Sequence, residues 1–122
     1  MALFELLYTS YSLMEKSDVI KLVERSKLSN VKNDITGCLL IADNELFQVI
    51  EGEELSVKDL FNKIKLDPRH TRIQLMWSST IDDRAFGKWT MIHKEITKEQ
   101  LHLTGKATTG QELLDIIQLQ IR

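Results

Sequence analysis

The sequence predicts an α+β domain with a ferredoxin-like βαββαββ sheet, two helices on one face of that sheet and a C-terminal helical tail. The main observation is a central hairpin, in which apolar runs at 35–41 and 46–50 flank the turn residues 42–45. The second is the order of periodicities along the chain, which reads strand, helix, strand, strand, helix, strand, strand. A length of 122 residues with 43% hydrophobic content fits one domain with one well-formed core.

The chain begins with an expected strand from Leu3 to Ser10, followed by a helix from Asp18 to Asn30 with Ser17 as its N-cap. The helix positions expected to face inward change from apolar to polar toward its C-terminal end. These positions are Val19, Val23, Ser26 and Asn30. Such a stripe indicates either a helix that lines a polar space or one that frays at its end.

In the second strand of the hairpin, one amide interrupts an apolar pattern. Alternation places Gln48 on the same face as Leu46 and Ile50, while Phe47 and Val49 point to the other face. Both faces are apolar, which predicts a central strand covered on both sides. An unpaired buried amide costs about 1–3 kcal/mol, so Gln48 needs a polar side chain or a bound ligand as its partner.

A second helix is expected after the hairpin, with Ser56 as its N-cap and Pro68 ending it. Its apolar positions follow helical spacing and are Val57, Leu60, Phe61 and Ile64. The fourth strand should place Ile73, Leu75 and Trp77 on one face, with Gln74 and Met76 on the other.

A short fifth strand is expected at 89–92, and a C-terminal helix at 109–122. Because both earlier helices pack on one face of the sheet, this last helix is the expected cover of the other face. Its apolar stripe consists of Leu113, Leu114, Ile117 and Ile121. If the helix packed elsewhere, the bare face would take a partner subunit, which makes a homo-oligomer an expectation.

Composition narrows the function classes. Sixteen Lys and Arg against 18 Asp and Glu give a net charge of -2, which does not indicate a nucleic-acid-binding surface. The single cysteine, Cys38, lies in an apolar run and fits a buried side chain in a reducing cytosol rather than a disulfide or metal ligand. The first residues show neither a signal peptide nor a membrane span, so we expect a cytoplasmic protein that binds no metal.

Six sequence elements, in this order and at compatible spacings, resemble the BLUF family, the sensors of blue light using FAD. They are Tyr8, Asn30, Ile35-Thr36-Gly37, Phe47-Gln48 with Glu51-Gly52, Asp67-Pro68-Arg69-His70, and Trp89-Thr90-Met91. The resemblance covers about residues 3 to 93. It implies a flavin-binding domain at 1–93 and a helical cap at 94–122.

The resemblance implies that FAD is bound non-covalently and that two residues carry the photochemistry. Tyr8 matches the family's electron and proton donor, and Gln48 matches the glutamine whose hydrogen bonds switch on illumination. The chemistry suits these residue types, since a tyrosine that loses an electron and a proton needs an acceptor within reach. A glutamine amide has both donors and an acceptor, and can exchange their roles by rotating or tautomerising.

Further residues match the family's flavin-binding positions. Asn30 matches the asparagine at the polar edge of the isoalloxazine ring, and Ser29 stands where the family commonly has a second asparagine. Arg69 and His70 match a basic pair near the flavin's carbonyl, ribityl or phosphate groups. Lys63 is a further candidate for a flavin phosphate, although an exposed lysine explains it equally simply.

Trp89 and Met91 match the residues that pass the signal on, by a change of packing between the strand at 86–92 and the C-terminal tail. The chain shows no segment typical of a cyclase, phosphodiesterase or DNA-binding domain. We therefore expect a stand-alone member that acts through contacts with a downstream protein or with its own copies.

Two alternatives remain open at this point. Each matched residue also has an ordinary structural explanation: a core tyrosine, a helix-terminal asparagine, a satisfied core amide, a polar turn, or apolar core filling. A flavin-free interaction module of the same fold is therefore the main alternative. A hydrolase of the acylphosphatase kind would need a glycine-rich anion-binding loop that the sequence lacks, so we do not expect an enzyme.

Overall fold

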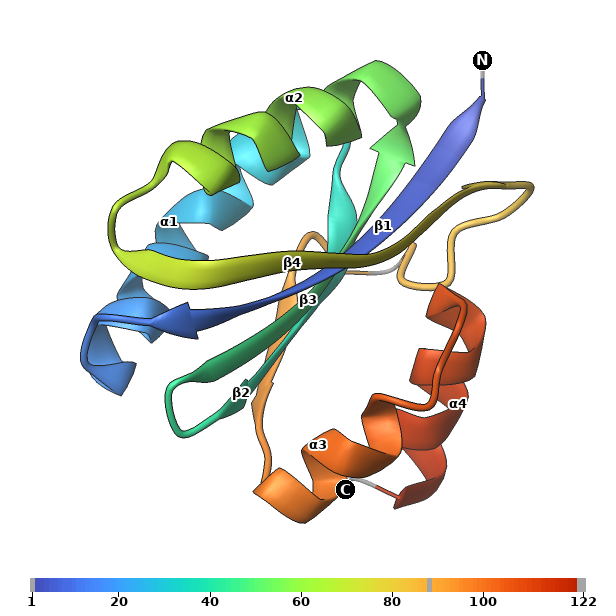
Figure 1. Ribbon diagram of the computed structural model, residues 1–122. Coiled ribbons are helices and arrows are strands. Elements are labelled where there is room, and N and C mark those ends of the chain that lie inside the picture. The colour runs from blue at the N-terminus through green and yellow to red at the C-terminus, as the bar shows by residue number, and fades with distance from the viewer. Residues whose placement is uncertain (1, 88, 121–122) are drawn as a thin grey trace.

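A five-stranded sheet separates two layers of helices in the computed structural model, which describes residues 2–87 and 89–120 (Figure 1). The spatial strand order is β4-β1-β3-β2-β5, with β5 parallel to β2 and the other neighbours antiparallel. The elements are β1 (Leu3–Ser12), α1 (Lys16–Lys32), β2 (Thr36–Ala42), β3 (Glu45–Glu53), α2 (Glu54–Leu66), β4 (His70–Ile81), β5 (Ile92–Glu95), α3 (Lys98–Thr104) and α4 (Gly110–Gln120). The expected fold class is confirmed. The short helix α3 was not expected.

Each face of the sheet has its own apolar core. The first core lies under α1 and α2, and its main members are Phe4, Leu6, Tyr8, Val19, Val23, Ile35, Leu39, Ile50, Val57 and Phe61. The second core lies under α3 and α4, and its main members are Leu7, Cys38, Leu40, Phe47, Val49, Phe86, Ile96, Leu113 and Ile117. Each such side chain contributes about 1.5–3 kcal/mol when fully buried, so both helical layers hold the sheet in place.

The central strand β3 has the alternation expected from its sequence. Leu46 and Ile50 belong to the first core, whereas Phe47 and Val49 belong to the second, so Gln48 faces α1 and α2. Close packing between β2 and β3 explains a glycine in the hairpin, because a Cβ on Gly37 would lie 2.1 Å from the backbone oxygen of Val49.

The expectation that Ile73, Leu75 and Trp77 share one face of β4 is wrong. Leu7 pairs with Trp77 but the next residue, Tyr8, pairs with Leu75, so β4 has one extra residue at this point. Such a bulge reverses the faces on either side of it. Ile73 consequently packs against the first core, and Trp77 against the second.

The expected helix caps are also wrong. Glu15 and Glu53 are the N-cap residues of α1 and α2, neither with a side-chain cap bond, and Ser17 and Ser56 lie inside the first turns. A serine cap would accept hydrogen bonds from the free backbone N–H groups of the first turn. Here, acidic residues near both helix starts interact favourably with the helix dipoles instead. The end of α2 at Leu66, before Pro68, is as expected.

The fifth strand starts later than expected, at Ile92, because its pairing with β2 begins with Cys38 and Ile92. The segment 89–91 is not part of it. The C-terminal helix covers the second face as expected, with Leu113 and Ile117 buried, while Ile121 and Arg122 lie outside the described residues. Since this face is covered, it no longer argues for a partner subunit.

Within the described ranges, no helix combines the length and apolar character that a membrane span requires. The same residues contain no group of three or more His, Cys, Asp or Glu side chains that could hold a metal ion.

Candidate functional site

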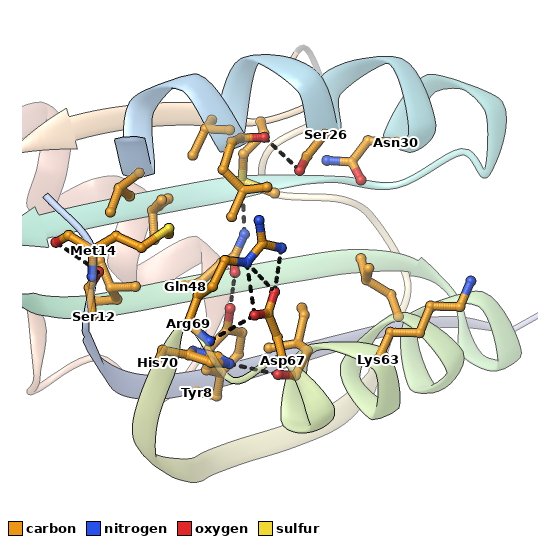
Figure 2. A pocket seen from close by; sticks show the side chains of 18 residues that line it. Tyr8, Ser12, Met14, Ser26, Asn30, Gln48, Lys63, Asp67, Arg69 and His70 are labelled. Atoms are coloured by element: carbon orange, nitrogen blue, oxygen red, sulfur yellow. Dashed lines mark hydrogen bonds and ion pairs between the residues drawn. The ribbon is translucent and has the colours of Figure 1, made fainter. Parts of the chain in front are cut away.

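A hollow of about 250 Å³ lies between the sheet and the helices α1 and α2 (Figure 2). Its walls are mostly aliphatic, with polar groups set among them, which is the usual composition of a small-molecule site. The residues that line it are Tyr8, Ser12, Met14, Val19, Leu22, Val23, Ser26, Asn30, Leu39, Leu46, Gln48, Leu60, Lys63, Ile64, Asp67, Arg69, His70 and Met91. All four inward positions predicted on α1 are among them, so this helix lines a partly polar space.

Tyr8, Gln48 and Met91 form a connected row on the sheet side of the hollow. Tyr8 on β1 pairs directly with Gln48 on β3, and the Tyr8 hydroxyl donates a hydrogen bond to the Gln48 Oε1 atom. On its other side, the Gln48 Nε2 atom lies 3.4 Å from the Met91 Sδ atom. A thioether is a weak acceptor, so the Gln48 amide can take a stronger one from a ligand in the hollow.

Tyr8 is held neutral by its surroundings. Only 3% of the residue is exposed, and its ring packs against Phe61 with the centroids 5.4 Å apart. Burial raises the pKa of the Tyr8 hydroxyl well above its ordinary value, and the negative charge of Asp67 raises it further. Tyr8 therefore keeps its proton at neutral pH and can supply it along the bond to Gln48.

Asn30 lies at the far end of α1, facing into the hollow (Figure 2). It is buried, and its Nδ2 atom donates a 3.1 Å hydrogen bond to the backbone oxygen of Thr90. The neighbouring Ser29 is exposed and accepts a 3.3 Å bond from Asn33 on the helix surface. Of the two positions, only Asn30 contributes to the hollow.

Arg69 and Asp67 form an ion pair at the mouth of the hollow. The Arg69 Nε and Nη2 atoms lie 2.9 and 2.6 Å from the two Asp67 oxygens, and this pairing lowers the pKa of Asp67 to about 2. No bond from Arg69 Nη1 to another described residue is present, so the guanidinium keeps donors for a ligand. By contrast, both His70 ring nitrogens are engaged, with Ser10 Oγ at 3.0 Å and Ile64 O at 2.6 Å.

Trp89 and Met91 lie on opposite sides of the sheet. Met91 is 3% exposed and belongs to the hollow. Trp89 packs with Phe86, with the ring centroids 6.4 Å apart, and lines a separate depression together with Leu114 of α4. Lys63 is exposed on α2 and reaches only the rim of the hollow (Figure 2).

Sequence reasoning missed some of the lining residues. Ser12 ends β1 and Met14 follows it, where no periodic pattern marks them, and the Ser12 Oγ atom accepts a 3.0 Å bond from the Met14 backbone nitrogen. The sequence resemblance includes Asp67 with Arg69 and His70 but gives it no role, although an aspartate two residues before Arg69 is well placed to pair with it.

Comparison with known proteins agrees with this geometry. Residues 3–92 match the family model of the sensors of blue-light using FAD. The chain is 35% identical over 86 residues to the blue light- and temperature-regulated antirepressor BluF of Escherichia coli (strain K12), covering 68% of this chain and 21% of that protein. It is 32% identical over 91 residues to the photoactivated adenylate cyclase subunit alpha of Euglena gracilis, covering 72% of this chain and 9% of that protein.

The chain thus spans about a fifth or less of these curated relatives. Among solved structures, it resembles the dark state of BlrB, a BLUF protein, with a TM-score of 0.78 and 26% identity, covering 95% of this chain and 92% of that one. The family match extends over most of the chain. The protein belongs to the BLUF family, the sensors of blue light using FAD.

Proposed function

We propose that this chain is a blue-light photoreceptor that binds FAD non-covalently in the hollow between α1 and α2. The observation that carries the proposal is the buried Tyr8 hydroxyl bonded to Gln48, whose amide nitrogen has only the Met91 thioether as its partner. A flavin-free module has no evident need for this pair. The fold and the family match support the same conclusion.

The residues of the hollow fit a flavin. Aliphatic side chains on α1 and α2, such as Val23 and Ile64, suit the faces of a flat ring. The amides of Asn30 and Gln48 suit its polar edge. The free donors of Arg69 at the mouth suit carbonyl, ribityl or phosphate oxygens, whereas His70 serves to fix the start of β4.

The bound flavin, after absorbing blue light, supplies an acceptor for an electron. Tyr8 is the donor, because its ring lies in the hollow and its hydroxyl proton has a path to Gln48 Oε1. Loss of the electron would make the phenol strongly acidic, so its proton would pass to Gln48 Oε1 while the Gln48 amide nitrogen releases a proton toward the ligand. The electron and a proton would return to Tyr8 during dark recovery. Gln48 then exchanges its donor and acceptor roles and changes its contact with Met91. This altered contact starts the signal.

We place the sensor in residues 1–93 and the output in the cap 94–122, which acts on other proteins and performs no catalysis. The buried free thiol of Cys38 suits a cytoplasmic location. Light-dependent self-association is one form of output. Light scattering of the flavin-bound protein in darkness and under blue light tests it, and a monomer at all concentrations in both conditions would exclude it.

The first experiment is the visible absorption spectrum of the purified protein in darkness, under blue light and during dark recovery. We expect a flavin spectrum that shifts reversibly to the red without bleaching. Chromatography of the flavin released by denaturation distinguishes FAD from FMN. A colourless protein that also fails to take up added FAD would favour the flavin-free module.

Gln48→Leu should retain flavin and lose the red shift, because it removes the switching amide at similar volume. Tyr8→Phe should likewise retain flavin and lose the ordinary photocycle. Gln74→Leu is the matched control, since Gln74 is exposed on β4 outside the hollow, and should leave the shift unchanged. A normal shift in Gln48→Leu would overturn the mechanism.

A further inference from the structure

Glu51 is a fully buried carboxylate on the face of β3 opposite Gln48. Its Oε1 atom accepts hydrogen bonds from the Thr36 hydroxyl at 2.8 Å and the Phe86 backbone nitrogen at 2.7 Å. Its Oε2 atom accepts one from the Ala85 backbone nitrogen at 2.9 Å. Glu51 therefore fixes the chain that follows β4 to the centre of the sheet.

Glu5 is the direct cross-strand neighbour of Glu51 and is 3% exposed. Its Oε2 atom accepts a 3.1 Å hydrogen bond from the backbone nitrogen of Gly110, the first residue of α4. A Cβ on Gly110 would lie only 2.6 Å from that oxygen, so an alanine here would displace the Glu5 carboxyl group from the start of the helix. Glu5 thus fixes the start of α4 to the sheet.

The connection after β4, described at residues 86–87 and 89–91, bonds Glu51 at one end and reaches the hollow at the other. At its first residue, it is bonded to Glu51. Near its other end, Asn30 donates to a backbone oxygen of the segment at 3.1 Å, and the Met91 sulfur contacts Gln48. Met91 and Phe86, at the two ends of this connection, therefore contact the hollow and Glu51 respectively.

Burying two carboxyl groups next to each other in a sheet costs free energy. Burial raises the pKa of Glu5, and the negative charge of Glu51 raises it further. Like charges directly opposite each other on neighbouring strands are destabilising. In the described part of the chain, Arg84 donates to Thr36 Oγ1 at 3.0 Å, to the backbone oxygen of Glu51 at 3.4 Å and to Asp34 Oδ2 at 2.9 Å, but to neither of the two buried carboxyl groups. Neutral side chains at these two positions would pack at a lower desolvation cost.

We propose that Glu51 and Glu5 are positioning residues that transmit the state of the hollow to α4, Glu51 through the segment 86–91 and Glu5 through Gly110. This inference rests on the proposed photoreceptor function. It assigns the output surface to α4, whose start the pair holds, and it leaves the flavin contacts to other residues.

The test uses the flavin-bound full chain and measures amide hydrogen exchange of α4 in darkness and under blue light, alongside the absorption shift. Glu5→Leu removes the acceptor of the Gly110 bond, and Gly110→Ala displaces the Glu5 carboxyl group from that bond. Both should keep the absorption shift and reduce the light-minus-dark difference in α4 at least fivefold, roughly the factor that one net hydrogen bond represents. Glu5→Gln keeps an acceptor oxygen and should restore the difference.

The matched control is Glu112→Leu, because Glu112 also lies at the start of α4 but is exposed, and its carboxylate bonds only Thr108. It should leave the light-minus-dark difference intact.

Glu51→Gln, which loses one of two acceptor oxygens, should also abolish the light-minus-dark difference in α4 exchange.

Three outcomes would overturn the inference. The first is a wild-type protein whose absorption shifts while α4 exchange does not change with light. The second is an unchanged light-minus-dark difference in Glu5→Leu and Gly110→Ala. The third is faster exchange by the same factor in darkness and light, which would show a purely structural role. A wild-type protein without any absorption shift would instead refute the proposed function.

Discussion

Replacing Gln48 by leucine should destabilise the flavin-free protein mainly through the hydroxyl group it leaves behind. Tyr8 is 3% exposed, and its hydroxyl donates to the Gln48 Oε1 atom. A buried donor without an acceptor costs about 1–3 kcal/mol. The added apolar contact of leucine with Leu46 and Ile50 on the same face offsets part of this cost. We expect the free energy of unfolding to fall by about 1–2 kcal/mol.

Tyr8→Phe should cost less, about 0.5–1 kcal/mol, because Gln48 is only partly buried and water can replace the lost hydroxyl. The double variant removes both partners and leaves no orphaned group. Its loss of stability should therefore be smaller than the sum of the two single losses, with a coupling energy of about 1–1.5 kcal/mol.

Urea unfolding, followed by the fluorescence of Trp77 and Trp89, measures all four proteins of this cycle. Flavin must be removed first, because a ligand that binds the native state adds to its stability. Gln74→Leu on the exposed strand β4 is the control and should change stability by less than about 0.5 kcal/mol. Additive losses for Tyr8→Phe and Gln48→Leu, within about 0.3 kcal/mol, would refute the reasoning.

Three further predictions concern stability and reactivity. Gly37→Ala should unfold at a clearly lower urea concentration than Gly87→Ala. The added Cβ would lie 2.1 Å from a backbone oxygen at Gly37, but 3.5 Å from its nearest neighbour at Gly87. Equal urea midpoints would contradict this reasoning. The ion pair with Arg69 lowers the pKa of Asp67 from 3.8 to about 2, so the stability that this pair contributes is present above pH 4 and is lost as the pH falls toward 2. In Asp67→Asn, the urea midpoint should therefore change less over this pH range than in the wild-type protein. Burial raises the pKa of Cys38 to about 12. A thiol reagent at pH 8 should therefore label the protein unfolded in urea but not the native protein. Rapid labelling of the native protein would show that the thiol is accessible.

The parts of the fold that follow from a repeating pattern could be predicted from sequence. Alternation on β3 places Gln48 correctly between Leu46 and Ile50, and helical spacing places Ser26 and Asn30 on the inner face of α1. These positions depend only on the geometry of a strand or helix once its type is known. Much of the candidate hollow was therefore visible in the sequence.

The remaining features depend on pairing between distant segments. The bulge at Met76 arises where β4 meets β1, and it moves Trp77 to the opposite face from Ile73. Similarly, the segment 89–91 is apolar enough for a strand. Within this described segment, only the backbone oxygen of Trp89 bonds β2, at Gly37, whereas that of Thr90 bonds the Asn30 side chain. No local pattern of residue types distinguishes such cases.

The burial of two glutamates has a local signal that is easily overlooked. Glu5 shares a face of β1 with Leu7, and Glu51 shares a face of β3 with Phe47 and Val49, all of them buried. A charged residue at an inward position of a central strand needs a built set of partners. The strand pattern could therefore have identified both carboxyl groups, although only the fold shows that their partners are the chain after β4 and the start of α4.

Gln48 and Glu51 are three residues apart on one strand, an odd spacing that puts them on opposite faces of the sheet. Gln48 contacts Tyr8 and Met91 in the hollow, while Glu51 holds Phe86 under the C-terminal helices. A single strand thus carries the amide to which we assign the switch and a carboxylate that bonds the chain after β4. Because Met91 and Phe86 also belong to one short connection, the two faces are joined through the backbone as well as across the sheet. In the proposed photoreceptor, this arrangement would connect a rearrangement of the Gln48 amide to the helices on the other face of the sheet.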